Sequence, residues 1–362
     1  MARPDVPNLS RTLAVLLAGG EGTRLHELGA LEAKPALPFA GRRLVDFAVA
    51  SAVAAGVTRM AVALQHRPAT LDRHLPGQWG RDIELLLRDG PRLGGFAGTA
   101  EALARCLETC GGPPPREVLV LPADQAQALD LRALIAAHRE SGAPVTLAEP
   151  PFTGSSEILG PCVFEAGFLA EALRRDAEDE ASTRDLWNDL LPLAAGRGDI
   201  ATWQVPEGTY WRDIDTLDAF RDASLDFTRG APPCPLPPAE RAGPIDEDRQ
   251  AIAIAAGGLT LTAPRFGART PGRWTLLEDT IIMPGARVAS GARLSRAIVA
   301  PGAIVPAGLV VGDDPAEDAR WFRVTSGGTT LITAPMLAAR AAERMRAQFG
   351  GRLAGLATPG HQ

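Results

Sequence analysis

The chain contains little lysine, tyrosine or cysteine. Its 37 basic residues include a single lysine, Lys34, and its only tyrosine is Tyr210. Four scattered cysteines are too few for a disulfide framework, and the i,i+4 spacing of Cys106 and Cys110 indicates core packing rather than a metal site. Because arginine and lysine differ in shape and hydration, one lysine in an arginine-rich chain is either a functional residue or a chance survivor on the surface.

Long hydrophobic runs and an excess of positive charge are also absent. The 362 residues carry 43 acidic and 37 basic side chains, so the net charge of -6 offers no basic surface to nucleic-acid phosphates. No run approaches the roughly 18 apolar residues of a membrane span, and the N-terminal sequence MARPDVPNLSRT lacks the layout of a signal peptide. We therefore expect a cytoplasmic globular protein of two domains, with neither nucleic acid nor membrane as a partner.

In the N-terminal part, short apolar runs alternate with helical patterns. The runs predict buried strands at residues 12–17, 59–64, 117–121 and 144–147, and the helical patterns cover residues 45–56, 98–109 and 129–141. This alternation predicts an α/β fold, a Rossmann-like parallel sheet with helices on both faces. In such sheets ligands bind at the carboxyl ends of the strands.

A proline-rich segment, residues 232–238, indicates the boundary of a second domain. Beyond it, apolar residues recur every six positions, at Ile282, Val288 and Leu294 and again at Ile298, Ile304 and Val310. A period of six predicts a parallel β-helix with these residues pointing inward and a register slip between the two series, although an ordinary β-sandwich stays possible. An alanine-rich basic helix over residues 334–353 is expected to cap the coil.

A glycine-rich turn, residues 18–25, follows the first predicted strand. It is neither a Walker A loop nor a G-x-G-x-x-G fingerprint. Its glycines at 19, 20 and 22 nevertheless let backbone N–H groups approach a polyphosphate. Arg24 adds a cation there and Lys34 follows ten residues on, so together they predict a pyrophosphate clamp. A surface lysine has few packing contacts, so its replacement is expected to cost little stability.

Six segments in order resemble one family. They are the turn at 18–25, Ala-Lys-Pro-Ala at 33–36, Gly-Arg-Arg-Leu-Val-Asp-Phe-Ala at 41–48, Gly-Thr-Ala-Glu-Ala at 98–102, Tyr-Trp-Arg-Asp at 210–213 and the stretch 311–320. With these motifs the chain resembles the bacterial ADP-glucose pyrophosphorylases, or glucose-1-phosphate adenylyltransferases, among the sugar-phosphate nucleotidyltransferases. The resemblance implies a catalytic GT-A-like domain at 1–230, a linker at 231–250 and a left-handed β-helix with its capping helix at 251–362.

The resemblance also implies an activity. The expected reaction transfers a nucleotidyl group from ATP to a sugar 1-phosphate, in the family glucose 1-phosphate, and yields an ADP-sugar and pyrophosphate for glycogen-type glucan synthesis. Catalysis of this kind is mostly positioning plus cationic stabilisation of the leaving group. The implied assembly is a homotetramer, or a hetero-oligomer with a paralogue.

The family's functional positions fall on matching residues of this chain. Arg24 and Lys34 are expected to hold the leaving pyrophosphate, and Mg²⁺ is expected at Asp124 and Asp213, because hard cations prefer carboxylates. The implied nucleotide site comprises Gly19, Gly20, Gly22, Thr23, Gln65, Gly98 and Thr99, with Gln65 at the edge of the base. The implied sugar site comprises Asp185 and Trp211.

The sugar side departs from the family pattern. Ala148-Glu149-Pro150-Pro151 runs almost directly into Gly160, so the hairpin that supplies a sugar-phosphate lysine looks deleted. Ile158 and Cys162 stand where the family has a serine and a tyrosine. These losses favour a rival interpretation, a catalytically weak or inactive regulatory subunit that binds nucleotide and assembles with an active paralogue.

The residues just before the Ala-Lys-Pro motif also differ from the family pattern. Related bacterial enzymes are activated by phosphorylated glycolytic intermediates through a basic residue a few positions before that motif. Here Leu31 and Glu32 occupy the approach, so we expect little activation by an anionic effector unless Arg11, Arg42 or Arg43 supplies a substitute site.

Overall fold

A computed structural model describes residues 9–108, 110–150, 160–228, 230–239, 252–254, 260–262 and 275–356. The chain divides into two compact units, one formed by Met1–Asp215 with Pro233–Pro244 and one by Thr216–Pro232 with Ile245–Gln362. The second unit therefore includes residues 216–230, which the sequence interpretation assigned to the catalytic domain. From residue 240 on, the predicted linker 231–250 lies outside the described residues.

The first unit is built on a seven-stranded sheet. Its order is β10-β8-β9-β6-β1-β4-β5. The strands are β1 (Thr12–Ala18), β4 (Arg59–Leu64), β5 (Glu84–Asp89), β6 (Glu117–Pro122), β8 (Val145–Glu149), β9 (Cys162–Glu165) and β10 (Ile200–Gln204). The predicted α/β fold is confirmed, and the four predicted strands β1, β4, β6 and β8 run parallel to one another. Strand β9, which was not predicted, runs antiparallel to β6 and β8. Antiparallel neighbours need no crossover helix, so the short chain between β8 and β9 suffices to connect them.

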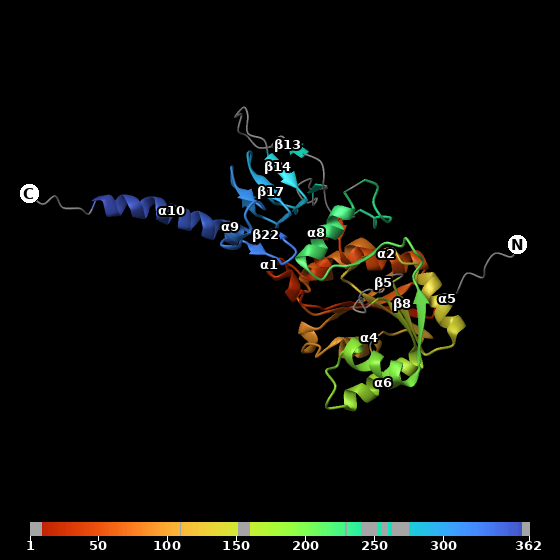
Figure 1. Cartoon of the computed structure of the whole chain (residues 1–362). Coiled ribbons are helices and arrows are strands. Elements are labelled where there is room, and N and C mark those ends of the chain that lie inside the picture. The colour runs from red at the N-terminus through yellow and green to blue at the C-terminus, as the bar shows by residue number, and fades with distance from the viewer. Residues whose placement is uncertain are drawn as a thin grey trace, which may run out of the picture. The chain divides into compact units, whose positions relative to one another are not determined.

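Helices cover both faces of this sheet (Figure 1). One face carries α2 (Val45–Ala55), α3 (Ala69–Trp79) and α5 (Leu131–Ser141), and the other carries α4 (Thr99–Glu108), α6 (Ala166–Glu178) and α7 (Leu191–Arg197). The strands are apolar on both sides: in β1, Leu16 packs into the first of these two cores and Val15 into the second. This is why β1 and β6 appear in the sequence as continuous hydrophobic runs.

Short elements at the carboxyl ends of the strands position the candidate site. After β1 come the one-turn helix η1 (Thr23–Leu25), α1 (Glu27–Leu31), the one-turn helix η2 (Lys34–Ala36) and the hairpin of β2 (Pro38–Phe39) with β3 (Arg42–Arg43). The turn η3 (Pro91–Leu93) follows β5, and the short helix η4 (Leu186–Leu190) precedes α7. Directly after β6, β7 (Gln125–Gln127) pairs antiparallel with β11 (Trp211–Asp213). We call this pair the ribbon.

The second unit contains a three-sided parallel β-helix. One side consists of β12 (Ile252–Ile254), β15 (Thr280–Ile282), β18 (Ala297–Val299), β22 (Thr330–Ile332) and β21 (Arg323–Val324). The second side consists of β13 (Thr260–Thr262), β14 (Thr275–Glu278), β17 (Arg293–Ser295) and β20 (Val310–Val311), and the third of β16 (Arg287–Val288) with β19 (Ile304–Val305). The prediction of a β-helix is therefore confirmed, and the β-sandwich alternative is wrong.

The inward register of the second coil was predicted one residue too early. Strand pairing places Val305 beside Val288 and Val311 beside Leu294, and both valines are buried in the coil's core. Ile304 is 65% exposed and Val310 is 41% exposed, although the six-residue count placed both inside. A shift of one residue moves every side chain of a strand to its opposite face.

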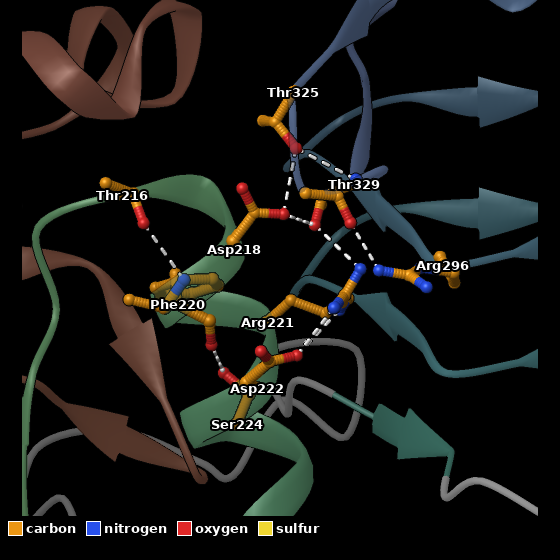
Figure 2. Close-up of polar contacts among 11 residues, drawn as sticks. Thr216, Asp218, Phe220, Arg221, Asp222, Ser224, Arg296, Thr325 and Thr329 are labelled. Atoms are coloured by element: carbon orange, nitrogen blue, oxygen red, sulfur yellow. Dashed lines mark hydrogen bonds and ion pairs between the residues drawn. The ribbon is translucent and has the colours of Figure 1, made fainter. Parts of the chain in front are cut away.

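Helix α8 (Leu217–Asp226) is fastened to the β-helix by a partly buried polar network (Figure 2). The carboxylate of Asp218 accepts hydrogen bonds from the hydroxyls of Thr325 and Thr329. The guanidinium of Arg221 donates to the Thr329 hydroxyl at 2.7 Å. A side chain at Gly327 would come within 2.6 Å of the Asp218 carboxylate, so a larger residue there would have to displace that carboxylate.

We predict that Asp218→Ala lowers the stability of the second unit by about 1–3 kcal/mol, because two hydroxyls lose their acceptor at once. Thermal unfolding monitored by circular dichroism measures the change. The control is Glu343→Ala in α10 (Ala334–Leu356), where the side chain is exposed and an unchanged melting temperature is expected. Equal melting temperatures for Asp218→Ala and the native chain would show that the network adds nothing.

The predicted C-terminal helix is present as α10. Met336 and Leu337 pack against the core of the β-helix, whereas residues 341–347 are exposed, so only the beginning of α10 caps the coil. Among the helices that the structure describes, none combines the length and the apolar character needed to cross a bilayer.

Candidate functional site

Three aspartates converge at the carboxyl end of the sheet. Asp124 follows strand β6, Asp213 ends β11, and Asp215 lies two residues further on. One carboxylate oxygen from each lies within 4.8 Å of the others. The backbone holds this geometry, since the N–H of Ile214 donates to the carbonyl of Asp124 at 3.2 Å.

The environment of Asp213 fits a divalent cation. Burial and the charges of Asp124 and Asp215 raise the pKa of Asp213 to about 7. Its Oδ1 atom is buried and has no hydrogen-bond partner among the described residues. Three carboxylates with an unused buried oxygen are a donor set that hard cations such as Mg²⁺ prefer.

Lys34 lies inside this cluster. It belongs to the one-turn helix η2, where Pro35 suits the first turn, and only 5% of the residue is exposed. Its Nζ lies 2.8 Å from Asp124 Oδ2 and also forms an ion pair with Asp215. Burial by itself lowers the pKa of Lys34, but the two carboxylates outweigh burial and the pKa is raised. The expectation of a surface lysine that is cheap to replace is therefore wrong.

Arg24 meets Lys34 through a shared partner. Its guanidinium pairs with Oδ2 of Asp215, and the Lys34 ammonium pairs with Oδ1 of the same carboxylate. The Arg24 side chain is 67% exposed, so it can reorient toward a ligand while Lys34 stays fixed. The structure thus brings together the two cations of the predicted clamp.

The glycine-rich turn packs directly onto two candidate side chains. Gly22 has φ 63, and a Cβ there would lie 3.1 Å from the Cβ of Lys34. A Cβ at Gly19 would lie 3.1 Å from the Cβ of Gln65. Gly20 has open space around it, and Thr23 begins η1. Both crowded glycines therefore allow a close approach that larger residues would block.

The side chain of Gln65 is engaged by the backbone. Its Nε2 donates to the carbonyl of Phe96 at 3.0 Å, and its Oε1 accepts from the N–H of Phe96 at 2.6 Å. This bidentate contact fixes the loop between β5 and α4 against the end of β4. A contact of Gln65 with a base edge would compete with it.

Gly98, Thr99 and Asp185 form one connected structure. The hydroxyl of Thr99 donates to Oδ2 of Asp185 at 2.9 Å, and Oδ1 of Asp185 accepts from the N–H groups of Trp187 and Asn188. Asp185 is therefore the N-cap of η4 as well as the predicted sugar ligand. A Cβ at Gly98 would lie 2.2 Å from the Arg184 carbonyl oxygen, so the two segments touch through bare backbone.

Trp211 lies on the ribbon beside the start of β9. Its indole Nε1 donates to Oε1 of Gln125 at 3.0 Å, and a Cβ at Gly160 would come within 2.4 Å of its ring. Cys162 is completely buried in β9. Ile158 lies outside the described residues.

Two polar residues of this region were not identified from the sequence. Asp215 could have been found, because side chains two residues apart in extended backbone point to the same side and Asp213 was already a candidate. Gln127, on the same ribbon as Trp211, offers no sequence signal of its own.

Comparisons with known proteins agree on both halves of the chain. The nucleotidyl transferase family model matches residues 13–153, and the model of the GlmU-like C-terminal hexapeptide matches residues 269–332. The chain is 30% identical to a glucose-1-phosphate adenylyltransferase of Jannaschia sp. (strain CCS1) and 31% identical to one of Bradyrhizobium diazoefficiens; each alignment covers 91% of this chain and 97% of the relative. A protein of the same name from Rhodospirillum rubrum is 30% identical over 91% of this chain and 96% of its own length.

Proposed function

Since the chain belongs to the glucose-1-phosphate adenylyltransferase family, we propose that it transfers the adenylyl group of ATP to glucose 1-phosphate, giving ADP-glucose and pyrophosphate for glycogen-type glucan synthesis. The chain is a nucleotidyltransferase with a left-handed hexapeptide β-helix. The observation that supports the proposal best is the buried Lys34, held between Asp124 and Asp215 and packed against Gly22 of the glycine-rich turn.

In the proposed reaction a phosphate oxygen of the sugar phosphate attacks the α-phosphorus of ATP. The bond from the α-phosphorus to the bridging oxygen breaks, and negative charge grows on the departing pyrophosphate. Mg²⁺, held by Asp124, Asp213 and Asp215, would neutralise charge on the phosphate oxygens when bound. The chain's own contribution is to orient the two phosphates and to present cations to the leaving group.

Lys34 and Arg24 are the cations that the chain presents to the leaving group. Nζ of Lys34 is 2.8 Å from Asp124, so phosphate bound at the aspartates meets a cation that is already fixed in place. Such preorganised charge stabilises a transition state without a cost of reorganisation. Arg24 is mostly exposed and pairs with Asp215, so it exchanges that carboxylate for the pyrophosphate as the substrate enters.

A pyrophosphate-release assay on the purified full-length chain tests the proposed function. It screens the common nucleoside triphosphates against several sugar 1-phosphates in the presence of MgCl₂. We expect the highest rate with ATP and glucose 1-phosphate, and no release without a sugar phosphate. Another preferred pair would redefine the substrates, and no turnover with any pair would contradict the proposal.

The rival regulatory-subunit interpretation is not favoured, because the curated relatives that match most of the chain are named as glucose-1-phosphate adenylyltransferases. Assembly and location remain part of the proposal. We propose a cytoplasmic homotetramer or a hetero-oligomer with a paralogue, and analytical ultracentrifugation at micromolar concentration distinguishes these assemblies from a monomer.

The structure adds to the expectation of weak activation by anions. Leu31 is 48% exposed, and the Glu32 carboxylate accepts hydrogen bonds from the Thr70 hydroxyl and the backbone N–H of Ala33. The position before the Ala-Lys-Pro motif therefore presents an apolar residue and a fixed negative charge.

The three candidate replacement cations contact backbone carbonyls instead. Arg42 donates to the carbonyl of Pro237 at 2.6 Å and Arg43 to that of Ala36 at 2.6 Å. Arg11 donates to the carbonyl of Pro114 at 3.3 Å. We predict that saturating fructose 1,6-bisphosphate changes the initial rate less than about twofold at subsaturating ATP and glucose 1-phosphate, because its phosphates meet Glu32. An increase of tenfold or more would contradict this.

A further inference from the structure

The ribbon carries four side chains on one face. Strand pairing sets Asp213 opposite Gln125 and Trp211 opposite Gln127. Residues directly opposite each other in an antiparallel pair point to the same side, and residues two apart along a strand do so too. The metal-site aspartate therefore shares its face with an indole and two amides.

The two glutamines of this face differ in how their amides are used. Oε1 of Gln125 accepts the hydrogen bond from the Trp211 indole and so fixes the orientation of that ring. Gln127 is only 2% exposed, yet neither Oε1 nor Nε2 of its amide has a hydrogen-bond partner among the described residues. Buried polar atoms are almost always paired, and an unpaired one costs about 1–3 kcal/mol.

Gln127 lies opposite a rigidly held aromatic side chain. Opposite it lies the Trp211 ring, held by Gln125 on one edge and pressed against the bare backbone of Gly160 on another. Sites for small molecules combine such a rigid apolar wall with a few precisely placed polar groups.

The position of Gln127 along the ribbon indicates which part of the substrate it would contact. Two residues along a strand span about 6.6–6.8 Å, so Gln127 lies one step beyond the Asp213 end where phosphate is proposed to bind. A neutral amide that both donates and accepts suits hydroxyl groups, which do the same, whereas a phosphate dianion can only accept. The group that follows the phosphate in a sugar 1-phosphate is the hydroxyl-bearing ring.

We propose that the amide of Gln127 binds ring hydroxyls of the sugar 1-phosphate and so helps to determine which sugar is accepted. This inference rests on the proposed function, because the reaction supplies the sugar phosphate. It assigns sugar recognition to the ribbon, beside Gly160.

The substitution Gln127→Leu keeps the side-chain size and removes the amide. We expect the KM for glucose 1-phosphate to rise about tenfold, and the preference over galactose 1-phosphate to fall, while the KM for ATP stays unchanged. The melting temperature should stay equal or rise, because an unpaired buried amide is replaced by apolar atoms.

Gln78→Leu is the matched control. Gln78 is likewise a buried glutamine, 3% exposed, but its Nε2 donates to the carbonyls of Pro238 and Ala239. Gln78→Leu is expected to lower the melting temperature and to keep the KM for both substrates. Gln127→Leu is expected to do the opposite, raising the KM for the sugar phosphate without lowering the melting temperature. An unchanged sugar KM and sugar preference in Gln127→Leu would overturn the inference while leaving the proposed function intact.

A binding measurement separates the inference from catalysis. Isothermal titration calorimetry compares ADP-glucose with ADP on the native chain and on Gln127→Leu. We expect the native chain to bind ADP-glucose more tightly than ADP and the variant to lose most of that difference. If the native chain shows this difference without turnover and the variant loses it, the result would contradict the proposed function but support the role of Gln127. A variant that keeps the difference, or a native chain that binds both ligands equally, would overturn that role.

Discussion

The substitution Asp213→Asn is expected to abolish nucleotidyl transfer while leaving the chain folded. Asparagine keeps the size of the side chain but removes the charge that a hard cation requires. Metal stabilisation of the transferring phosphates contributes several kcal/mol, so we expect turnover to fall at least about a thousandfold. Asp124→Asn is expected to have the same effect, and EDTA should abolish the activity of the native chain. The pyrophosphate-release assay in MgCl₂ measures all three.

Without metal, in EDTA, Asp213→Asn is expected to make the folded chain more stable, although it abolishes activity. The pKa of Asp213 is raised to about 7, first by burial and then by the charges of Asp124 and Asp215, while the ordinary value is 3.8. A carboxyl with a raised pKa contributes stability that is complete below pH 3.8 and is lost as the pH rises through 7. Above pH 7, Asp213→Asn should therefore unfold at a higher temperature than the native chain, and this advantage should shrink toward pH 4.

Asp72→Asn controls for the substitution itself. Asp72 lies in the first turn of α3, away from the three aspartates in sequence, and its replacement should change neither turnover nor the effect of EDTA. If Asp213→Asn and Asp124→Asn both retained normal turnover and metal dependence, the three-aspartate site would be wrong.

The local patterns of this chain were sufficient to predict part of its secondary structure. Residues 59–64 were predicted as a strand and form β4 with the same limits, because a continuous apolar run bounded by a glycine turn needs no distant information. The helix predicted at 45–56 forms α2, where Gly56 takes the left-handed conformation that ends it.

Features that depend on distant residues could not be predicted in this way. The direction of β9 follows from its neighbours β6 and β8 and not from its own sequence. The inward register of the β-helix depends on which residue of the previous coil lies alongside, as Val288 does for Val305. A six-residue period fixes the spacing of the inward positions but not the point where the second coil starts.

For the candidate site too, the sequence identified individual residues but not the contacts between them. Lys34 and Asp124 were identified separately, but their contact joins residues that are 90 positions apart. The N-cap role of Asp185 and the bidentate contact of Gln65 with Phe96 likewise need the tertiary structure. Sequence motifs therefore predicted candidate site residues, whereas the structure shows which of their atoms are already engaged in hydrogen bonds or ion pairs.

Lys34→Met is expected to lower turnover at least about a hundredfold. Methionine keeps the unbranched stem against Gly22 but removes the ammonium that we propose faces the leaving pyrophosphate, and a lost transition-state contact of this kind costs about 10²–10³ in rate. Lys34→Arg should also fail despite its charge, because a larger planar head does not fit a site that is 5% exposed and closed by Gly22. Full activity in Lys34→Arg would mean that only the charge matters.

Lys34→Met should also unfold more easily than the native chain in the absence of metal. Removing one partner of a buried ion pair costs about 3–5 kcal/mol, but Asp124 and Asp215 keep 35% and 27% of their side chains exposed. We therefore expect a loss of about 1–3 kcal/mol in EDTA. Added MgCl₂ should recover more stability in Lys34→Met than in the native chain, because a divalent cation then replaces the missing positive charge among three carboxylates. Arg174→Met, at an exposed ion pair on α6, should show neither the loss of stability nor its recovery in MgCl₂. Equal responses to MgCl₂ in Lys34→Met and the native chain would show that Lys34 does not interact with the metal site.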